Sequence, residues 1–250
     1  MTRFQIITII ALPFAALTLV FGNLALLIVV LVAFGIVIGL GVTFPQLSLF
    51  GPYICRGKPS KRCVALTFDD GPDGRSTPAL LELLRDSGVA AAFFCVGERV
   101  AANRELAAQI VRDGHLLENH SYAHSNATNL FTVTRLKAEL AQAQTTIQQA
   151  TGIAPKLFRP PMGLSNPRVF RAARSLGLQV IGWSARGLDT QSHDPERIVT
   201  RIVRRLEPGA IILLHDGNIP VERLVVTVKL LLTKLKERGY AVVRLDKLLE

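Results

Sequence analysis

Apolar positions divide the chain into two parts with different patterns. Apolar residues predominate from Phe4 to Phe21 and again from Leu24 to Val42, and no Asp, Glu, Lys or Arg lies between Arg3 and Arg56. About 20 apolar residues are enough for a helix to cross a bilayer. Residues 1–44 therefore predict a membrane anchor of two transmembrane helices with a tight turn at Gly22-Asn23. The alternative is a cleaved signal peptide, whose apolar core would be shorter.

Short apolar runs alternate with amphipathic segments in the rest of the chain. Strands are predicted at Val64 to Phe68, Ala90 to Val96, His115 to Asn119, Lys156 to Arg159, Leu178 to Gly182, Ala210 to Leu214 and Ala241 to Leu245. Helices are predicted at Pro78 to Arg85, Arg104 to Asp113, Thr134 to Ala150, Asn166 to Leu176, Pro195 to Leu206 and Val221 to Arg238. This alternation indicates parallel strands with crossover helices. About seven strands suit a (β/α) barrel or an open doubly wound sheet, and periodicity does not separate the two.

Polar residues follow most of the predicted strands. They are Asp69-Asp70, His120, Arg159, the stretch from Trp183 to Asp189, and His215-Asp216. The carboxyl ends of parallel barrel strands meet at one face, so these side chains predict a site there. Two adjacent carboxylates repel each other and are stable beside a cation, or when one has a raised pKa. Taken alone, the pair would also suit a turn after a strand.

Two histidines four residues apart, His120 and His124, suggest a metal site. If the segment is helical they share one face, and Asp70 is the natural third ligand. Two histidines and one carboxylate around a metal with an open position form a hydrolytic arrangement. A solvated loop is the alternative interpretation of the histidine pair.

Four segments in this order resemble motifs of the polysaccharide deacetylase (NodB-homology) family. They are Thr67 to Pro72, His120 to His124, Arg159 to Gly163, and Leu213 to Asp216. The resemblance covers residues 63–250 and leaves out the anchor. It implies an α/β fold, a distorted (β/α) barrel of about seven strands. It also implies a metal-dependent hydrolase that removes N-acetyl groups from sugars.

The resemblance gives roles to individual residues. Asp70, His120 and His124 would bind a divalent metal, with zinc the usual one. Asp69 would be the general base that takes a proton from water, and Arg159 would orient it and compensate its charge.

The remaining implied roles concern the substrate pocket. The backbone N–H of Met162 would help hold the oxyanion, and His215 would be the general acid that protonates the departing amine. Asp189 would pair with His215 and raise its pKa. Trp183 and Leu214 would line the acetyl pocket, although a core role is the alternative for both.

The chain departs from the family pattern at two positions. Met162 stands where the family more often has Tyr, and Asp189 is followed by Thr190 rather than Trp. Arg186 lies close by. We expect a reshaped substrate wall around Asp189.

These residues predict a membrane-anchored hydrolase acting on carbon–nitrogen bonds of an N-acetylated glycan, such as peptidoglycan or a chitin-like oligosaccharide. One alternative is deacylation of a lipid-linked sugar at the membrane. Another is a catalytically silent glycan-binding membrane module. The presence of all the implied metal ligands, base and acid argues against the silent module.

The net charge of +10 includes a cluster of basic residues directly after the predicted anchor. Arg56, Lys58, Lys61 and Arg62 make residues 45–62 a basic linker that would suit anionic headgroups next to the anchor. The polar part shows no nucleic-acid-binding motif, so nucleic acid is not expected as a partner.

The side of the membrane is a conflict between two indications. The basic linker favours the cytoplasm by the positive-inside rule. The usual extracytoplasmic location of the family that the chain resembles and a possible Cys55–Cys63 disulfide favour the exterior. We expect an integral membrane protein whose catalytic domain faces the extracytoplasmic side.

Overall fold

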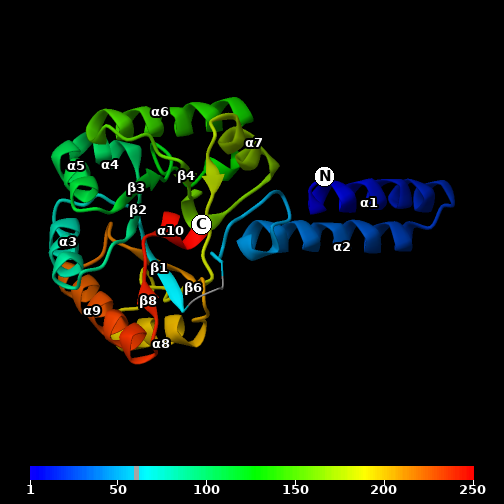
Figure 1. The fold of residues 1–250 in the computed structure, drawn as a ribbon. Coiled ribbons are helices and arrows are strands. Elements are labelled where there is room, and N and C mark those ends of the chain that lie inside the picture. The colour runs from blue at the N-terminus through cyan, green and yellow to red at the C-terminus, as the bar shows by residue number, and fades with distance from the viewer. Residues whose placement is uncertain (59–61) are drawn as a thin grey trace.

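The computed structural model describes residues 1–58 and 62–250. The first two helices, α1 (Arg3–Val20) and α2 (Leu24–Thr43), form an antiparallel pair that projects from an α/β domain (Figure 1). The turn between them lies at the end away from the domain. Both helices are long and apolar enough to cross a membrane, by length and composition only. Lys61 of the predicted basic linker lies outside the described residues.

Eight strands form one sheet within the described residues of the domain. They are β1 (Cys63–Asp69), β2 (Ala92–Cys95), β3 (Leu116–Asn119), β4 (Leu157–Phe158), β5 (Gln179–Val180), β6 (Ala185–Arg186), β7 (Ile211–His215) and β8 (Ala241–Val242). Seven run parallel in the order β5-β4-β3-β2-β1-β7-β6, and β8 pairs with the start of β1. This curved sheet is a parallel half-barrel, which confirms the predicted distorted barrel of about seven strands.

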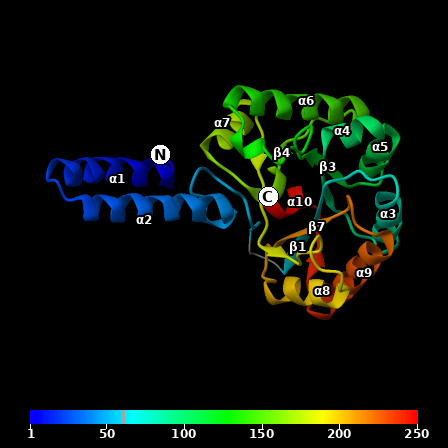
Figure 2. The same cartoon turned by 180° about the vertical axis from the view of Figure 1, so that it is seen from behind.

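Helices surround the sheet on the outside (Figures 1 and 2). They are α3 (Ser76–Asp86), α4 (Gly97–Ala102), α5 (Arg104–Arg112), α6 (Val133–Thr151), α7 (Pro167–Ser175), α8 (Pro195–Arg204), α9 (Val221–Glu237) and α10 (Leu245–Leu249). Single 3₁₀ turns occur at Pro45–Leu47 (η1), Thr128–Leu130 (η2) and Pro161–Gly163 (η3).

Three short elements were not predicted from the sequence, and one predicted strand is shorter than expected. α4, α10 and β6 were not expected, because elements of two to six residues are too short to show a hydrophobic period. The predicted strand from Ala241 to Leu245 ends at Val242, and Leu245 instead begins α10.

Alternation along the central strands positions the site. In β1, Val64, Leu66 and Phe68 pack into the large core beneath the helices. Ala65 belongs to the core inside the barrel, and Asp69 shares its side of the strand. Successive side chains of a strand point to opposite faces. The inward-facing set of β1 thus ends in Asp69, at the carboxyl end of the barrel.

The chain after α2 packs on the domain instead of forming a free spacer. Ile54 bridges Ile181 just beyond β5, and Arg56 bridges Ala210 just before β7. Tyr53 is buried, with its ring edge-on to Phe170 at 5.8 Å between centroids.

The possible Cys55–Cys63 disulfide is not formed, and both residues are free cysteines. Ile54 and Arg56 therefore belong to the packed domain without a disulfide beside them.

This packing predicts that Tyr53 stabilises the domain. Tyr53→Ala should lower the free energy of unfolding by about 3 kcal/mol, because it removes a buried aromatic side chain and leaves a cavity. Urea unfolding of the full chain in detergent micelles, followed by fluorescence of the single tryptophan, measures this. Leu130→Ala, at a side chain that is 77% exposed, should change little. Equal unfolding midpoints for Tyr53→Ala and the wild type would show that residues 45–58 are only a spacer.

Candidate active site

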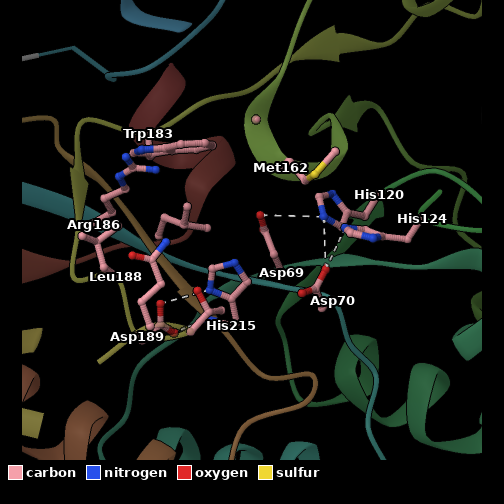
Figure 3. A pocket seen from close by; sticks show the side chains of 14 residues that line it. Asp69, Asp70, His120, His124, Met162, Trp183, Arg186, Leu188, Asp189 and His215 are labelled. Carbon is pink, nitrogen blue, oxygen red and sulfur yellow. Dashed lines mark hydrogen bonds and ion pairs between the residues drawn. The ribbon is translucent and has the colours of Figure 1, made fainter. Parts of the chain in front are cut away.

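Side chains from several strand ends meet at one cavity of about 310 Å³ at the carboxyl face of the half-barrel (Figure 3). Eight of the ten predicted site residues line it; Arg159 and Leu214 do not. The lining residues are Asp69, Asp70, His120, His124, Met162, Gly163, Trp183, Arg186, Leu188, Asp189, Thr190, Gln191, Leu213 and His215. Asp216 is fully buried and accepts a hydrogen bond from the Thr77 hydroxyl at 2.6 Å.

Asp70, His120 and His124 form a triad with metal-ligand chemistry. Oδ1 of Asp70 lies 3.4 Å from Nε2 of His120 and 3.1 Å from Nε2 of His124. One ligand atom from each residue lies within 4.8 Å of the other two. Burial acts to raise the pKa of Asp70, but hydrogen bonds from His120 and His124, with the charges of His120 and His215, outweigh it and lower the pKa. The carboxylate is therefore ionised and ready to bind a cation.

The histidine segment is a loop and not the helix that the spacing suggested. Ser121 and His124 have left-handed backbone conformations, with φ of 64° and 47°. The Asn119 side chain accepts a hydrogen bond from the Ser121 N–H at 2.8 Å, and the Ser121 hydroxyl accepts one from the His124 N–H at 3.2 Å. These local hydrogen bonds hold a conformation that brings both imidazoles to the same side.

The residues of the triad fit a divalent metal such as zinc. Two imidazole nitrogens and a carboxylate oxygen are the ligands that zinc takes in sites with an open position. Nδ1 of His120 is hydrogen-bonded to the carbonyl oxygen of Arg159 at 2.7 Å, which leaves Nε2 directed at the triad. A second hydrogen bond of this kind orients histidine ligands in metal sites.

Asp69 is held by a fully buried arginine. The Nη1 of Arg159 donates to Oδ1 of Asp69 at 2.6 Å and to the Thr67 hydroxyl at 2.8 Å. Its Nη2 donates to the carbonyl oxygen of Gly182 at 2.9 Å. The second carboxylate oxygen of Asp69, Oδ2, faces Nε2 of His120 at 3.9 Å. Arg159 thus occupies one oxygen of Asp69 and leaves the other toward the triad.

His215 and Asp189 form the predicted pair. One oxygen of Asp189 accepts a hydrogen bond from the His215 backbone N–H at 2.8 Å, and the other lies 3.0 Å from Nδ1 of the ring. Burial acts to lower the pKa of His215. The hydrogen bond and charge of Asp189, with the charges of Asp69 and Asp70, outweigh burial and raise the pKa to about 9. The imidazole is therefore a cation at neutral pH.

Two predicted pocket residues lie on the cavity wall. Met162, in η3, has φ of 57° and is 48% exposed at the rim above Asp69 and His120 (Figure 3). Trp183 packs against Gly163 so closely that any side chain at position 163 would collide with the indole. Gly163 therefore fixes the position of the tryptophan ring.

Leu214 does not line the cavity, contrary to the expectation. It lies in the large core beneath the helices, and Leu213 lines the cavity instead. The reason is strand alternation in β7, where Leu213 and His215 share the inward face and Leu214 points outward. The same alternation in the sequence would have identified Leu213. No comparable signal marks Leu188, whose left-handed φ of 58° is set by the fold.

Comparison with known proteins places the chain in a family. The family model of polysaccharide deacetylase matches residues 56–181. A peptidoglycan-N-acetylglucosamine deacetylase of Bacillus cereus is 35% identical over 192 residues, which cover 76% of this chain and 89% of the relative. The chain belongs to the polysaccharide deacetylase family. PgdA of Listeria monocytogenes, another peptidoglycan-N-acetylglucosamine deacetylase, is 32% identical over 79% of this chain, which spans only 41% of that relative.

Solved structures of the polysaccharide deacetylase family have the same fold. A peptidoglycan N-acetylglucosamine deacetylase in complex with an N-hydroxybenzamide is 28% identical, with a TM-score of 0.73 over 78% of this chain and 92% of that chain. A pseudoenzyme of carbohydrate esterase family 4 from Bacillus anthracis is 30% identical, with a TM-score of 0.74 over 80% of this chain and 69% of that chain. A mutant of that pseudoenzyme has restored enzymatic activity. The polysaccharide deacetylase fold therefore occurs with and without turnover.

The pairing with Asp189 predicts how His215 titrates. Its pKa, about 9, should fall toward the ordinary value near 6.5 in Asp189→Asn, because the neutral amide removes the carboxylate charge. Imidazole NMR over a pH series measures this, with Asp194→Asn, at the exposed cap of α8, as the control. Since the folded pKa is raised, charged His215 stabilises the fold below pH 6.5. That contribution is lost as the pH rises through about 9. An unchanged titration in Asp189→Asn would contradict the pairing.

The triad predicts a specific loss of metal affinity. His120→Ala should weaken zinc binding on the order of 100-fold, because one of three protein ligands and its orienting hydrogen bond disappear together. Competition with a chromophoric chelator measures the affinity. His193→Ala removes a histidine that does not line the cavity and should leave the affinity unchanged. Equal affinities for the wild type and His120→Ala would remove His120 from the ligand set.

Proposed function

We propose that this protein is a membrane-anchored, metal-dependent hydrolase that removes N-acetyl groups from a glycan, such as peptidoglycan or a chitin-like oligosaccharide. The observation that carries the proposal is the register of the two central strands. Asp69 at the end of β1 is paired directly with His215 at the end of β7, next to the triad. A carboxylate and an imidazolium thus lie on neighbouring strands over one cavity, as a base and an acid for one reaction.

A divalent metal held by Asp70, His120 and His124 would polarise the amide carbonyl and acidify water. The described residues supply the rest. Oδ1 of Asp69 is taken by Arg159, so Oδ2 is the oxygen that accepts a proton from the attacking water. The N–H of Met162 is proposed to hold the oxyanion, since its residue stands on the rim above Asp69.

His215 then acts as the general acid. As the water oxygen bonds to the carbonyl carbon and the carbon–nitrogen bond breaks, the leaving nitrogen needs a proton. His215 carries one at neutral pH because Asp189 supports its charged form. The products are acetate and a free amine on the sugar. Both relatives named above are peptidoglycan-N-acetylglucosamine deacetylases, which supports a glycan substrate.

We also propose that α1 and α2 anchor the protein in the membrane and that the domain faces the extracytoplasmic side. The length and apolarity of both helices support an anchor, although a signal sequence meets the same criteria. The Gln46 side chain donates to the carbonyl oxygen of Trp183 at 3.0 Å, so the chain leaving α2 touches the cavity wall. This contact supports the second candidate function, deacylation of a lipid-linked sugar close to the bilayer.

The proposed roles predict a loss of turnover without loss of metal. Asp69→Asn should reduce acetate release at least about 100-fold, because the amide cannot accept the proton, while zinc content stays that of the wild type. Acetate is measured from N-acetylglucosamine oligomers and from peptidoglycan, with the zinc-loaded full chain in detergent micelles. Asp113→Asn, on the exposed end of α5, is the matched control.

Equal acetate release by Asp69→Asn and the wild type would contradict the role of Asp69. If the wild type released acetate from neither glycan, that result would contradict the proposed hydrolysis of N-acetyl groups from a glycan. It would then favour the lipid-linked substrate or the silent module.

A further inference from the structure

Arg186 extends over the cavity from the short strand β6. It pairs with Leu213 in the register of β6 and β7, and its neighbour Ala185 is buried in the core. The Arg186 side chain lines the cavity, and its guanidinium carbon lies 5.7 Å from the centroid of the Trp183 ring. Figure 3 shows it along the wall of Trp183, Leu188 and Asp189, across from the triad.

Arg186 differs from the other charged groups of the cavity in having no partner of opposite charge. Asp69 is paired with Arg159 and Asp189 with His215, and Oδ1 of Asp70 lies within 3.4 Å of a ring nitrogen of both histidines of the triad. Within residues 1–58 and 62–250, the Arg186 guanidinium has the indole of Trp183 beside it but no hydrogen bond or ion pair. The Arg186 side chain is exposed and lines the cavity, so its N–H donors are accessible to a ligand.

The platform under Arg186 is rigid. Trp183 is only 6% exposed and is fixed by its contact with Gly163. A guanidinium over an indole face is held by a cation–π interaction, which leaves its in-plane N–H donors open. Fixing the side chain in advance lowers the entropic cost of binding a ligand there.

The position of Arg186 relates it to the reacting groups. Asp69 and His215 lie between the triad and the wall formed by Trp183 and Arg186 (Figure 3). A glycan whose acetamide lies over Asp69 and His215 therefore extends one of its substituents to that wall. A guanidinium offers paired N–H donors that match the oxygens of a carboxylate or a phosphate.

We propose that Arg186 is a specificity residue that binds an anionic substituent of the substrate, so that the protein selects anionic N-acetylated glycans over neutral ones. The inference rests on the proposed deacetylase function and adds the substrate class. The anionic oxygens belong either to a carboxylate on a neighbouring sugar of the glycan or to a phosphate on the sugar itself.

The experiment compares Arg186→Gln with the wild type on three matched substrates, using the zinc-loaded full chain in detergent micelles. One is a peptidoglycan-derived tetrasaccharide that carries carboxylates, the second is the same tetrasaccharide with its carboxylates reduced to alcohols, and the third is N-acetylglucosamine 1-phosphate. Arg135→Gln is the control, because Arg135 also lies over an aromatic ring, that of Phe131 at 3.7 Å, but does not line the cavity.

The wild type should have a higher kcat/KM for one anionic substrate than for the reduced tetrasaccharide, and added salt should weaken that preference. Arg186→Gln should lower kcat/KM for the preferred anionic substrate by roughly 10- to 150-fold, the range of a charge-assisted hydrogen bond, and leave kcat/KM for the neutral substrate unchanged. The anionic substrate whose kcat/KM falls in Arg186→Gln shows whether Arg186 binds a carboxylate or a phosphate. An equal effect on charged and neutral substrates, or no effect, would overturn the proposal.

Binding gives a readout that does not depend on turnover. Trp183 is the single tryptophan of the chain, so its fluorescence reports on ligands at Arg186 directly. If the wild type releases no acetate from any substrate, the proposed function fails. Quenching still decides the role of Arg186: weaker binding of only the anionic ligand in Arg186→Gln supports it, and unchanged binding rejects it.

Discussion

A single buried arginine connects the parts of the site. The guanidinium of Arg159 donates hydrogen bonds to Asp69 and Thr67 of β1 and to the carbonyl oxygen of Gly182. The backbone carbonyl oxygen of Arg159 is hydrogen-bonded to the imidazole of His120. A buried charge costs several kcal/mol unless it is fully compensated, so these partners are held in place together. One residue thereby orients the proposed base with its side chain and a proposed metal ligand with its backbone.

The architecture and most residues of the cavity could be predicted from the sequence, because apolar runs mark the strands and polar residues mark their carboxyl ends. Polar residues after apolar runs, such as Asp69 and His215, are brought together by the topology of a parallel sheet whatever the details of the loops. Family resemblance added the roles. The three residues of the triad lie together although His120 and His124 are on a loop and not on a helix. The left-handed conformations of Ser121 and His124 depend on hydrogen bonds to the side chains of Asn119 and Ser121, which the hydrophobic periodicity of the sequence does not show.

Features that the sequence did not predict depend on tertiary contacts or on very short elements. Leu214 was placed one residue out of register, and a shift of one residue moves a strand side chain to the opposite face. Residues 45–58 resemble a spacer in the sequence because Gly51-Pro52 interrupts their apolar members, among them Tyr53, so that no regular period results. The burial of Tyr53 and the bridges of Ile54 to Ile181 and of Arg56 to Ala210 show that they belong to the folded domain.

The lengths of the strands divide the cavity into two unequal halves. The half with Asp69, Asp70 and His120 rests on β1, β2 and β3, which have four to seven residues each, whereas β4, β5 and β6 have two each. Short strands contribute few ladder hydrogen bonds to a structure. The wall with Trp183 and Arg186 is therefore fixed mainly by side-chain packing, such as the contact of Trp183 with Gly163. Because it is held mainly by side chains and loops, it can diverge among related proteins without disturbing the residues of the triad. The fold thus separates the part that sets the chemistry from the part that is free to adapt.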